Sequence, residues 1–459
     1  MPTDVSVMRA AGPGERSPRH LAKAITALAA PLVLAQLAQT VMGLVDALMV
    51  GRLGGPPLAA LSLATLLFSA LAMSLKAVDV ACQTFTARRV GQGRDDQVGT
   101  VLATALTVVV ILGGLAALAV QRWPGQIMEI VTRDPEVDRL GAGYLHWRAV
   151  GLVPLLVFFQ LKAMGDGIGW TRVGMLAGLG MNLLNVALNW LLIFGHAGLP
   201  ALGVDGAAVA SSVSGAVAAL ALLAVYLRPG PRRRFRLLAR GNFHHELVRP
   251  FLAMAWPPAV QTLGVVVALT TFYVILGRIS TGTLAVGAVV LRLASVSYMP
   301  GLGVGAAVQT MVGQALGAGD VRRARRAAWT GMGLAMALMG ACGLVFLLLP
   351  APLLRLFGLD DALVRLGVPA LRLVGAAQGI NAVGLALSGG LRGAGHTRSV
   401  MAVDVVAGLG LMPPLAWLFG IAMGGDLLGA TWALAVWFTI YAAGMLVLFL
   451  RPHWHEVRP

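Results

Sequence analysis

Long apolar runs separated by short polar segments make up almost the whole chain. A membrane-spanning helix needs about 20 consecutive apolar residues, because each residue adds about 1.5 Å to its length. Twelve runs of this kind are present, at 25–50, 57–80, 98–120, 142–162, 173–194, 206–227, 250–276, 283–306, 327–349, 367–388, 399–420 and 428–450. The pattern predicts an all-α polytopic membrane protein with twelve transmembrane helices.

The two halves of the chain repeat one another in a single register, the one that aligns Pro31 with Pro257. Glycine, proline, arginine, glutamine and aspartate positions recur in this register without a gap. The further matches include Gly51-Arg52 with Gly277-Arg278, Gln83-Thr84 with Gln309-Thr310, Pro124 with Pro350, and Asp134 with Asp360. Apolar segments match by chance, but polar and special residues in a single register do not. The register indicates an internal duplication.

Each copy holds six spans. Because six is an even number, the second copy begins on the same side of the membrane as the first, and both copies have the same orientation. We therefore expect two parallel six-helix lobes, an architecture in which substrate binds between repeats that rock against each other. The predicted organisation follows from these boundaries: a cytoplasmic arm at 1–24, an N-lobe at 25–227, a basic cytoplasmic linker at 228–249, a C-lobe at 250–450 and a cytoplasmic tail at 451–459.

The composition is typical of a membrane protein, and the distribution of Lys and Arg predicts its orientation in the membrane. The chain has 459 residues, of which 58% are hydrophobic and 12% charged, with a net charge of +16. With the N-terminus inside, the inner segments hold 24 Lys and Arg and the outer loops hold 7. Because positive residues favour cytoplasmic loops, both termini are predicted to be cytoplasmic. The positive charge is then explained by the topology and by contact with anionic lipid, and it does not imply a nucleic-acid partner.

An aspartate near the end of the first span, Asp46 in "MGLVDALMVGRLG", needs an explanation. A carboxylate in a bilayer costs roughly 2.5–3.5 kcal/mol on insertion scales, so it is retained where it is paired, hydrated or used. The second copy has Phe272 at this position. Helix packing would serve both copies equally, so a polar group kept in one copy is a candidate for a task of that copy alone.

The same asymmetry marks the fifth and sixth spans. Asn185 and Asn189 meet Leu411 and Leu415 in the second copy, and Ser211 meets Trp437. The two asparagines are four residues apart and share one helix face. If the first and fifth spans are neighbours, Asp46 is their common partner; the alternative is ordinary hydrogen bonding between helices, of about 0.6 kcal/mol each.

Several motifs together resemble the MATE (multidrug and toxic compound extrusion) transporters. They are the segment from Pro31 to Leu61 with "GLVDALMVGRLG", "GQG" after the second span, "NVALNWLLIFG" from Asn185, "GLPALGVDGAAVASS" at 198–212 and "LRGAGHTR" at 391–398. The resemblance covers about residues 25–450. It implies two six-helix lobes around a central cavity and export of lipophilic, often cationic, organic compounds against a proton or sodium gradient.

The resemblance also assigns candidate ion-coupling residues. A first-span aspartate of the family maps onto Asp46, a fifth-span pair maps onto Asn185 and Asn189, and Ser211 stands where many members have threonine. One branch of the family carries acids in the seventh and tenth spans, but here the seventh span has no Glu, and Asn381 replaces the tenth-span Asp. Because these acids are missing, we expect ion coupling to take place at Asp46.

The expected mechanism is antiport. Burial disfavours the ionised form of a carboxyl group, so Asp46 can exchange a proton, and its neutralisation biases the inward-open and outward-open states. Entry of H⁺ or Na⁺ at Asp46 would then release substrate outward. A sodium site wants several oxygen ligands, and the sequence does not choose between the two ions. No other cofactor and no metal ion is expected.

Other polar residues in the spans are candidates for the substrate cavity. They are Gln36, Asp79, Arg292, Arg372, Asn381 and Asp404. Asp79 lies three residues after Lys76, which favours a same-helix ion pair, and Arg148 is expected at the interface because long basic side chains reach toward water at helix ends. Because the spans carry bases as well as acids, the sequence does not exclude neutral, zwitterionic or anionic substrates.

Two other functions compete with multidrug export. A flippase for lipid-linked oligosaccharides would need a strongly basic cavity and often has additional spans. A membrane enzyme would need a nucleophile or metal cluster, but the eight histidines are scattered, with only His244-His245 adjacent in the basic linker, and Cys82 and Cys342 are expected to be packing residues. We therefore expect a monomeric transporter in the bacterial inner membrane, not an enzyme, with the lipid bilayer and small organic molecules as partners.

Overall fold

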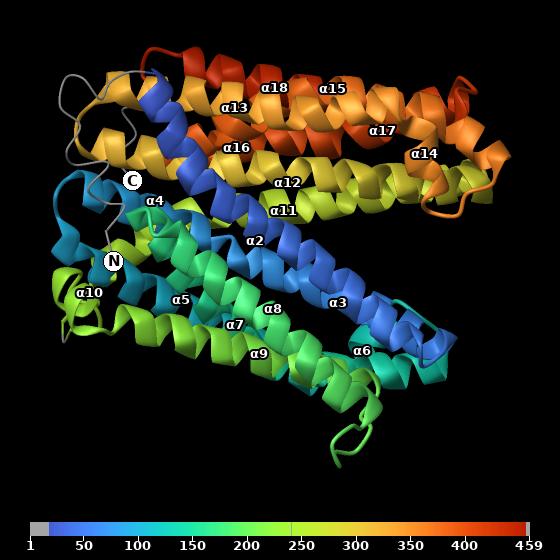
Figure 1. Cartoon of the computed structure of the whole chain (residues 1–459), viewed down its shortest axis with the longest axis horizontal. Helices are drawn as coiled ribbons and strands as arrows, with labels where there is room; N and C mark the ends of the chain where they lie inside the picture. Colours follow the sequence, from blue (N-terminus) through green and yellow to red (C-terminus); the bar gives the residue numbers. More distant parts are fainter. Residues whose placement is uncertain (1–17, 240, 456–459) are drawn as a thin grey trace. The chain divides into compact units, whose positions relative to one another are not determined.

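The computed structural model describes residues 18–239 and 241–455, and the regular structure in these residues is helical throughout (Figure 1). Twelve of the helical segments are long and apolar enough to cross a membrane. The predicted fold class, all-α with twelve transmembrane helices, is confirmed. The observed spans exceed the predicted ones at several ends because helices continue past the apolar run, as at Pro135–Ile168.

The chain divides into two compact units. The N-unit is Leu34–Ala259, and the C-unit contains the described residues up to Val33 together with those from Val260 onward. Two helices, α2 (Pro18–Gly51) and α11 (His245–Ile279), contribute to both units. The N-unit also contains α3 (Gly55–Lys76), α4 (Val78–Gly91), η2 (Asp95–Gln97), α5 (Val98–Arg122), α6 (Pro124–Glu129), α7 (Pro135–Ile168), α8 (Thr171–Phe194), α9 (Val204–Tyr226) and α10 (Pro229–Arg234).

The remaining helices belong to the C-unit. They are α12 (Thr281–Gly317), α13 (Val321–Leu348), α14 (Pro350–Arg355), α15 (Asp361–Gly393), α16 (Thr397–Asp404), η3 (Val405–Leu411), α17 (Met412–Trp417), η4 (Leu418–Ala422) and α18 (Asp426–Leu450). The predicted span at 399–420 is thus a broken helix in which η3 and η4 are π-helices. Pro413 and Pro414 lie between them, and proline removes a helix hydrogen bond and kinks the chain.

The units do not follow the predicted lobes at two places. The predicted N-lobe includes the start of α2, but Ile25 and Leu28 are buried in the hydrophobic core of the C-unit with Val304 and Val308. The predicted C-lobe includes the start of α11, but residues up to Ala259 group with the N-unit. The reason is that the repeat register shows which segments are equivalent, not which neighbours their apolar faces contact.

The repeat register is visible at the start of the fourth span of each half. Helices α7 and α15 begin at Pro135 and Asp361, and their N-caps are Asp134 and Asp360. The Asp134 carboxylate accepts hydrogen bonds from the Glu136 and Val137 amides, and Asp360 accepts one from Leu363. Such caps satisfy main-chain donors that a helix start leaves free.

These two helices also form the centre of their units. Helix α7 packs against α3, α4, α5 and α9, and α15 packs against α12, α13 and α18. Glycines permit the closest approach in the C-unit, because a Cβ atom on Gly389 of α15 would collide with the main-chain carbonyl of Gly305 of α12. This contact between two helix backbones leaves no flexible side-chain end that can move aside.

Replacing Gly389 with Ala is therefore expected to destabilise the protein by about 1–3 kcal/mol, the usual cost of overpacking. The adjacent Gly390 is the matched control, because a Cβ there would lie 3.5 Å from the Ala328 Cβ atom, in ordinary contact. Thermal unfolding of the two purified variants in detergent measures the difference. Equal stability of the Gly389→Ala and Gly390→Ala proteins would contradict the assigned packing.

Candidate functional site

The candidate ion-coupling residues come from three helices of the N-unit. Asp46 lies in the last two turns of α2, Asn185 and Asn189 lie one turn apart on α8, and Ser211 lies in α9. Helix α8 ends at Phe194 and is capped by Gly195, whose φ of +74° suits a residue without a side chain. Both asparagines are buried, at 4% and 0% exposure. The structure therefore brings the four predicted residues together.

A continuous chain of hydrogen bonds joins them. The Asn189 Nδ2 group donates to Asp46 Oδ1 at 2.5 Å and to Asn185 Oδ1 at 2.9 Å. The Asn185 Nδ2 group donates to Ser211 Oγ at 3.0 Å. Ser214, which the sequence did not single out, extends the chain because its hydroxyl lies 3.4 Å from Asn185 Nδ2. The carboxylate on α2 is thus linked to α8 and α9 through amide groups.

The Asn185 amide fits its surroundings in a second orientation. With its oxygen and nitrogen exchanged, the oxygen accepts from the Ser211 hydroxyl at 3.0 Å and from the Ser211 main-chain N–H at 3.1 Å, and the nitrogen lies 3.2 Å from Asp46 Oδ1. Oxygen and nitrogen of an amide are assigned from the hydrogen-bond network. The same heavy atoms therefore support two hydrogen-bond directions along the chain.

One acceptor at this site has no hydrogen-bond partner among the described residues. Asn189 Oδ1 is buried and unbonded, although the nitrogen of the same amide makes two hydrogen bonds. A buried polar atom without a partner costs roughly 1–3 kcal/mol and requires an explanation.

Arg148 of α7 is a component that the sequence interpretation missed. Its charge interacts with that of Asp46, and its guanidinium carbon lies 4.2 Å from the centre of the Phe68 ring. Its side chain is directed onto the Phe68 ring of α3 in the N-unit, a contact that the sequence did not indicate. The available signal was its place inside the apolar run at 142–162, six residues after the run begins.

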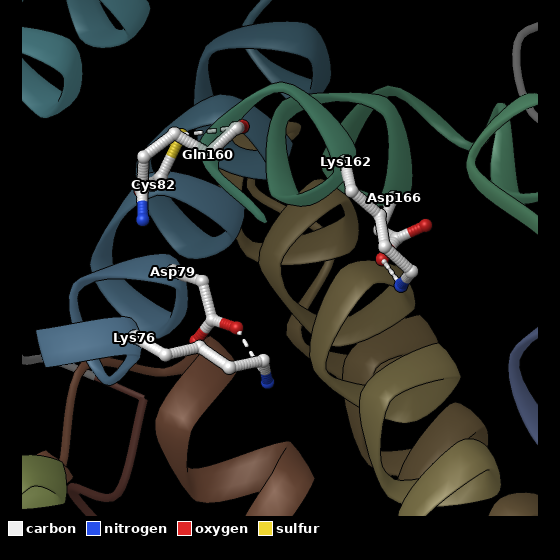
Figure 2. Close-up of polar contacts among 6 residues, drawn as sticks. All are labelled: Lys76, Asp79, Cys82, Gln160, Lys162 and Asp166. Atoms are coloured by element: carbon white, nitrogen blue, oxygen red, sulfur yellow. Dashed lines mark hydrogen bonds and ion pairs between the residues drawn. The ribbon is translucent and has the colours of Figure 1, made fainter. Parts of the chain in front are cut away.

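A second group of charged residues lies on α3, α4 and α7 of the same unit (Figure 2). The predicted Lys76–Asp79 ion pair is present at 3.0 Å and spans the break between α3 and α4 at Ala77. A second pair joins Lys162 Nζ and Asp166 Oδ2 at 2.6 Å on α7. The Asp166 side chain is 6% exposed, whereas that of Asp79 is 22% exposed.

Cys82 and Gln160 lie above the Lys76–Asp79 pair in Figure 2, where the Cys82 thiol donates to the main-chain oxygen of Gln160 at 3.7 Å. Cys82 is fully buried, in agreement with its interpretation as a packing residue. Among the described residues, no group of three His, Cys, Asp or Glu side chains could hold a metal ion.

The other cavity candidates are distributed over both units. Gln36 lies ten residues before it on α2, at intermediate exposure, and its main-chain oxygen accepts from Thr40. Arg292 on α12 and Arg372 on α15 are exposed, while Asn381 on α15 is 2% exposed. These three belong to the C-unit.

Asp404, the last candidate, has specific partners within the C-unit. Gln261 Nε2 donates to its Oδ2 atom at 2.6 Å, and Trp437 Nε1 donates to its Oδ1 atom at 3.2 Å. The Gln261 oxygen accepts from Arg392 at 2.9 Å, so an amide lies between a base and an acid. The sequence pattern predicts no pairing for these residues, because they come from four separate helical segments.

Comparisons with known proteins identify the family. The MatE family model matches residues 31–191 and again 257–418, so the two matches begin at the positions that the repeat register aligns. A probable multidrug resistance protein NorM of Rhizobium meliloti is 31% identical over 450 residues, covering 96% of this chain and 94% of the relative. The multidrug resistance protein PmpM of Pseudomonas aeruginosa is 27% identical over 401 residues, covering 87% and 84%.

Solved structures agree with these relatives on the fold. An outward-facing multidrug resistance MATE family transporter of the MOP superfamily superposes with a TM-score of 0.86 at 20% identity, covering 93% of this chain and 95% of that chain. The sequence motifs, the twelve helices and the double family match all support one assignment. The chain belongs to the MatE family of membrane transporters.

Proposed function

We propose that this protein exports lipophilic organic compounds, many of them cationic, in exchange for protons, and that Asp46 is the proton-binding residue. The observation that carries the proposal is the arrangement around Asp46: a carboxylate within a membrane span, bonded to Asn189 and joined through amides to α8 and α9. Ionisable groups within spans are costly and are characteristic of ion and proton pathways. The multidrug resistance names of the relatives support the class of substrate.

A proton suits this site better than a sodium ion. Sodium needs several oxygen ligands, as hard cations do, but Asp46 Oδ1 already accepts an N–H group from Asn189. A proton needs one acceptor. Once protonated, Asp46 becomes a donor, and if the Asn189 amide turns over its oxygen becomes the acceptor of that proton.

Reversal of the hydrogen-bond chain would carry this change to the neighbouring helices. With Asp46 ionised, the amides donate toward it and toward Asn185. With Asp46 protonated and the Asn189 amide turned over, the Asn185 nitrogen in its second orientation would donate to Asn189, and the Asn185 oxygen would accept both groups of Ser211. A proton on α2 thereby selects between two hydrogen-bond arrangements on α8 and α9, and such a choice biases a conformational equilibrium.

The charges around Asp46 explain how proton binding would release a cation. The ionised carboxylate offsets the charge of Arg148, so the pair is neutral and does not repel a cationic substrate. Protonation removes the negative charge and leaves Arg148 uncompensated, so a bound cation is repelled. Binding of proton and of substrate is then mutually exclusive, which is the requirement for antiport.

Transport in inverted membrane vesicles tests the proposal. We expect a fluorescent lipophilic cation to be concentrated in vesicles that contain the protein when a proton gradient is imposed, and we expect no accumulation with a sodium gradient alone. Collapse of the proton gradient should stop uptake. Accumulation driven by sodium alone would overturn the choice of ion, and equilibration without accumulation would indicate a channel. Failure with cations but success with anionic lipids would favour a flippase.

A further inference from the structure

The basic segment between α9 and α11 is a folded element of the N-unit. We call residues 228–239 and 241–243 the linker segment. Phe235 and Leu237 are buried in it, at 0% and 2% exposure. The Phe235 ring packs edge-on against Trp170, with ring centres 5.7 Å apart, and Trp170 stacks on Tyr226 at the end of α9. A flexible tether would not bury aromatic residues in this way.

Polar contacts fix the segment against the start of α5. The Gly99 N–H group donates to the Phe235 carbonyl at 2.9 Å, and Arg234 Nε pairs with Asp95 Oδ2 at 2.9 Å. A Cβ atom on Gly99 would lie 2.5 Å from the Arg236 carbonyl oxygen, so only glycine allows this approach. Asn242 Nδ2 donates to the same Arg236 carbonyl. The linker segment is therefore held at several points along its length.

Side chains along residues 235–238 of the linker segment are alternately buried and exposed, and the backbone angles that produce this alternation are unfavourable. Arg236 and Leu238 have positive φ angles of 47° and 52°, which residues other than glycine seldom adopt. Such angles persist where surrounding contacts impose them. Here they direct Phe235 and Leu237 into the N-unit while Arg236 and Leu238 stay exposed.

The exposed face of the segment combines arginines with large apolar side chains. Its exposed arginines are Arg228, Arg232, Arg233 and Arg236. Within residues 18–239 and 241–455, the structure records an ion pair for Arg234 and none for these four. Leu238 is 50% exposed and Phe243 is 49% exposed on the same segment.

The position of this exposed face in the chain limits which partners it can bind. The segment begins two residues after the spanning helix α9 ends at Tyr226, and it ends just before the spanning helix α11 begins at His245. It therefore joins the ends of two helices that are long and apolar enough to cross a membrane. Exposed arginines beside exposed apolar side chains are the combination that binds anionic lipid surfaces.

We propose that the linker segment is an interfacial anchor, in which the four exposed arginines bind the phosphate groups of anionic phospholipids and Leu238 and Phe243 enter the acyl-chain boundary. The positive φ angles at Arg236 and Leu238 leave these two side chains exposed while Phe235 and Leu237 are buried. The partner is the anionic leaflet of the surrounding membrane. This inference does not depend on the proposed transport reaction.

A fluorescent label at position 238 of the full-length protein tests the anchor. The label is an environment-sensitive dye on Leu238→Cys in a Cys342→Ser background, since Cys82 is buried and Cys342 is partly accessible. In phosphatidylcholine vesicles containing phosphatidylglycerol, we expect blue-shifted emission and severalfold stronger quenching by nitroxide-labelled lipid than in phosphatidylcholine alone. The Arg232→Gln/Arg233→Gln/Arg236→Gln variant should lose this difference.

The matched control removes three exposed arginines elsewhere, in Arg322→Gln/Arg325→Gln/Arg326→Gln at the start of α13. It should keep the response to phosphatidylglycerol. Equal loss in the control would assign the effect to overall charge and overturn the proposal. So would a label that stays in water in all vesicles, equal quenching in phosphatidylcholine, or a response to inorganic phosphate added to phosphatidylcholine vesicles.

Discussion

Replacement of Asp46 with Asn is expected to abolish proton-driven export while leaving the protein in the membrane. Asparagine fits the same space and keeps a hydrogen-bond acceptor for Asn189 but cannot carry an exchangeable proton or a charge. We expect the transport rate to fall below about a tenth of the wild-type value, since a charge-assisted hydrogen bond contributes about 1.5–3 kcal/mol and a tenfold change corresponds to about 1.4 kcal/mol. Uptake of a fluorescent lipophilic cation into inverted vesicles provides the measurement.

Substrate binding at different pH values separates loss of coupling from loss of structure. In the wild type, lowering the pH should weaken binding of a cationic substrate, because a proton and the cation compete for the Asp46 carboxylate. In Asp46→Asn, binding should be weaker overall and independent of pH. The control is Asp361→Asn, which removes an exposed carboxylate outside the candidate sites that pairs with Arg355. Normal transport by Asp46→Asn would refute the assignment and direct attention to Asp79 or Asp404.

Replacement of Asp166 with Asn should cause the largest loss of stability. The Lys162–Asp166 pair is short and its acid is nearly buried, so removal of the acid leaves an ammonium group without its partner in the membrane span. Breaking a buried pair in this way costs about 3–5 kcal/mol. The Lys76 and Asp79 side chains are 26% and 22% exposed, so Asp79→Asn should cost less than about 1 kcal/mol.

Thermal unfolding in detergent compares the two variants directly. The double replacement Lys162→Met/Asp166→Leu distinguishes an unpaired charge from lost packing, because it removes both charges and keeps similar volume. We expect it to recover most of the stability lost in Asp166→Asn. An Asp166→Asn protein as stable as Asp79→Asn would show that burial does not distinguish the two ion pairs.

The sequence alone was sufficient for the class of fold and for the repeat. Apolar runs long enough to cross a bilayer predict helices, because main-chain groups in lipid must bond within their own segment. The repeat register reappears in the structure at the N-caps Asp134 and Asp360 and at the starts of α7 and α15. Comparison of the two copies also selected Asp46, Asn185, Asn189 and Ser211, which lie in one hydrogen-bonded chain.

Only the tertiary structure decided which faces of the helices meet. Lipid tails are as apolar as leucine, so a hydrophobic face gives little indication of whether it contacts lipid or another helix. For this reason the sequence could not place the start of α2 in the core of the C-unit, Arg148 near Asp46, or Gln261 beside Asp404. The linker segment likewise reads as a basic loop, because its fold depends on contacts with Gly99 and Trp170, residues distant in sequence.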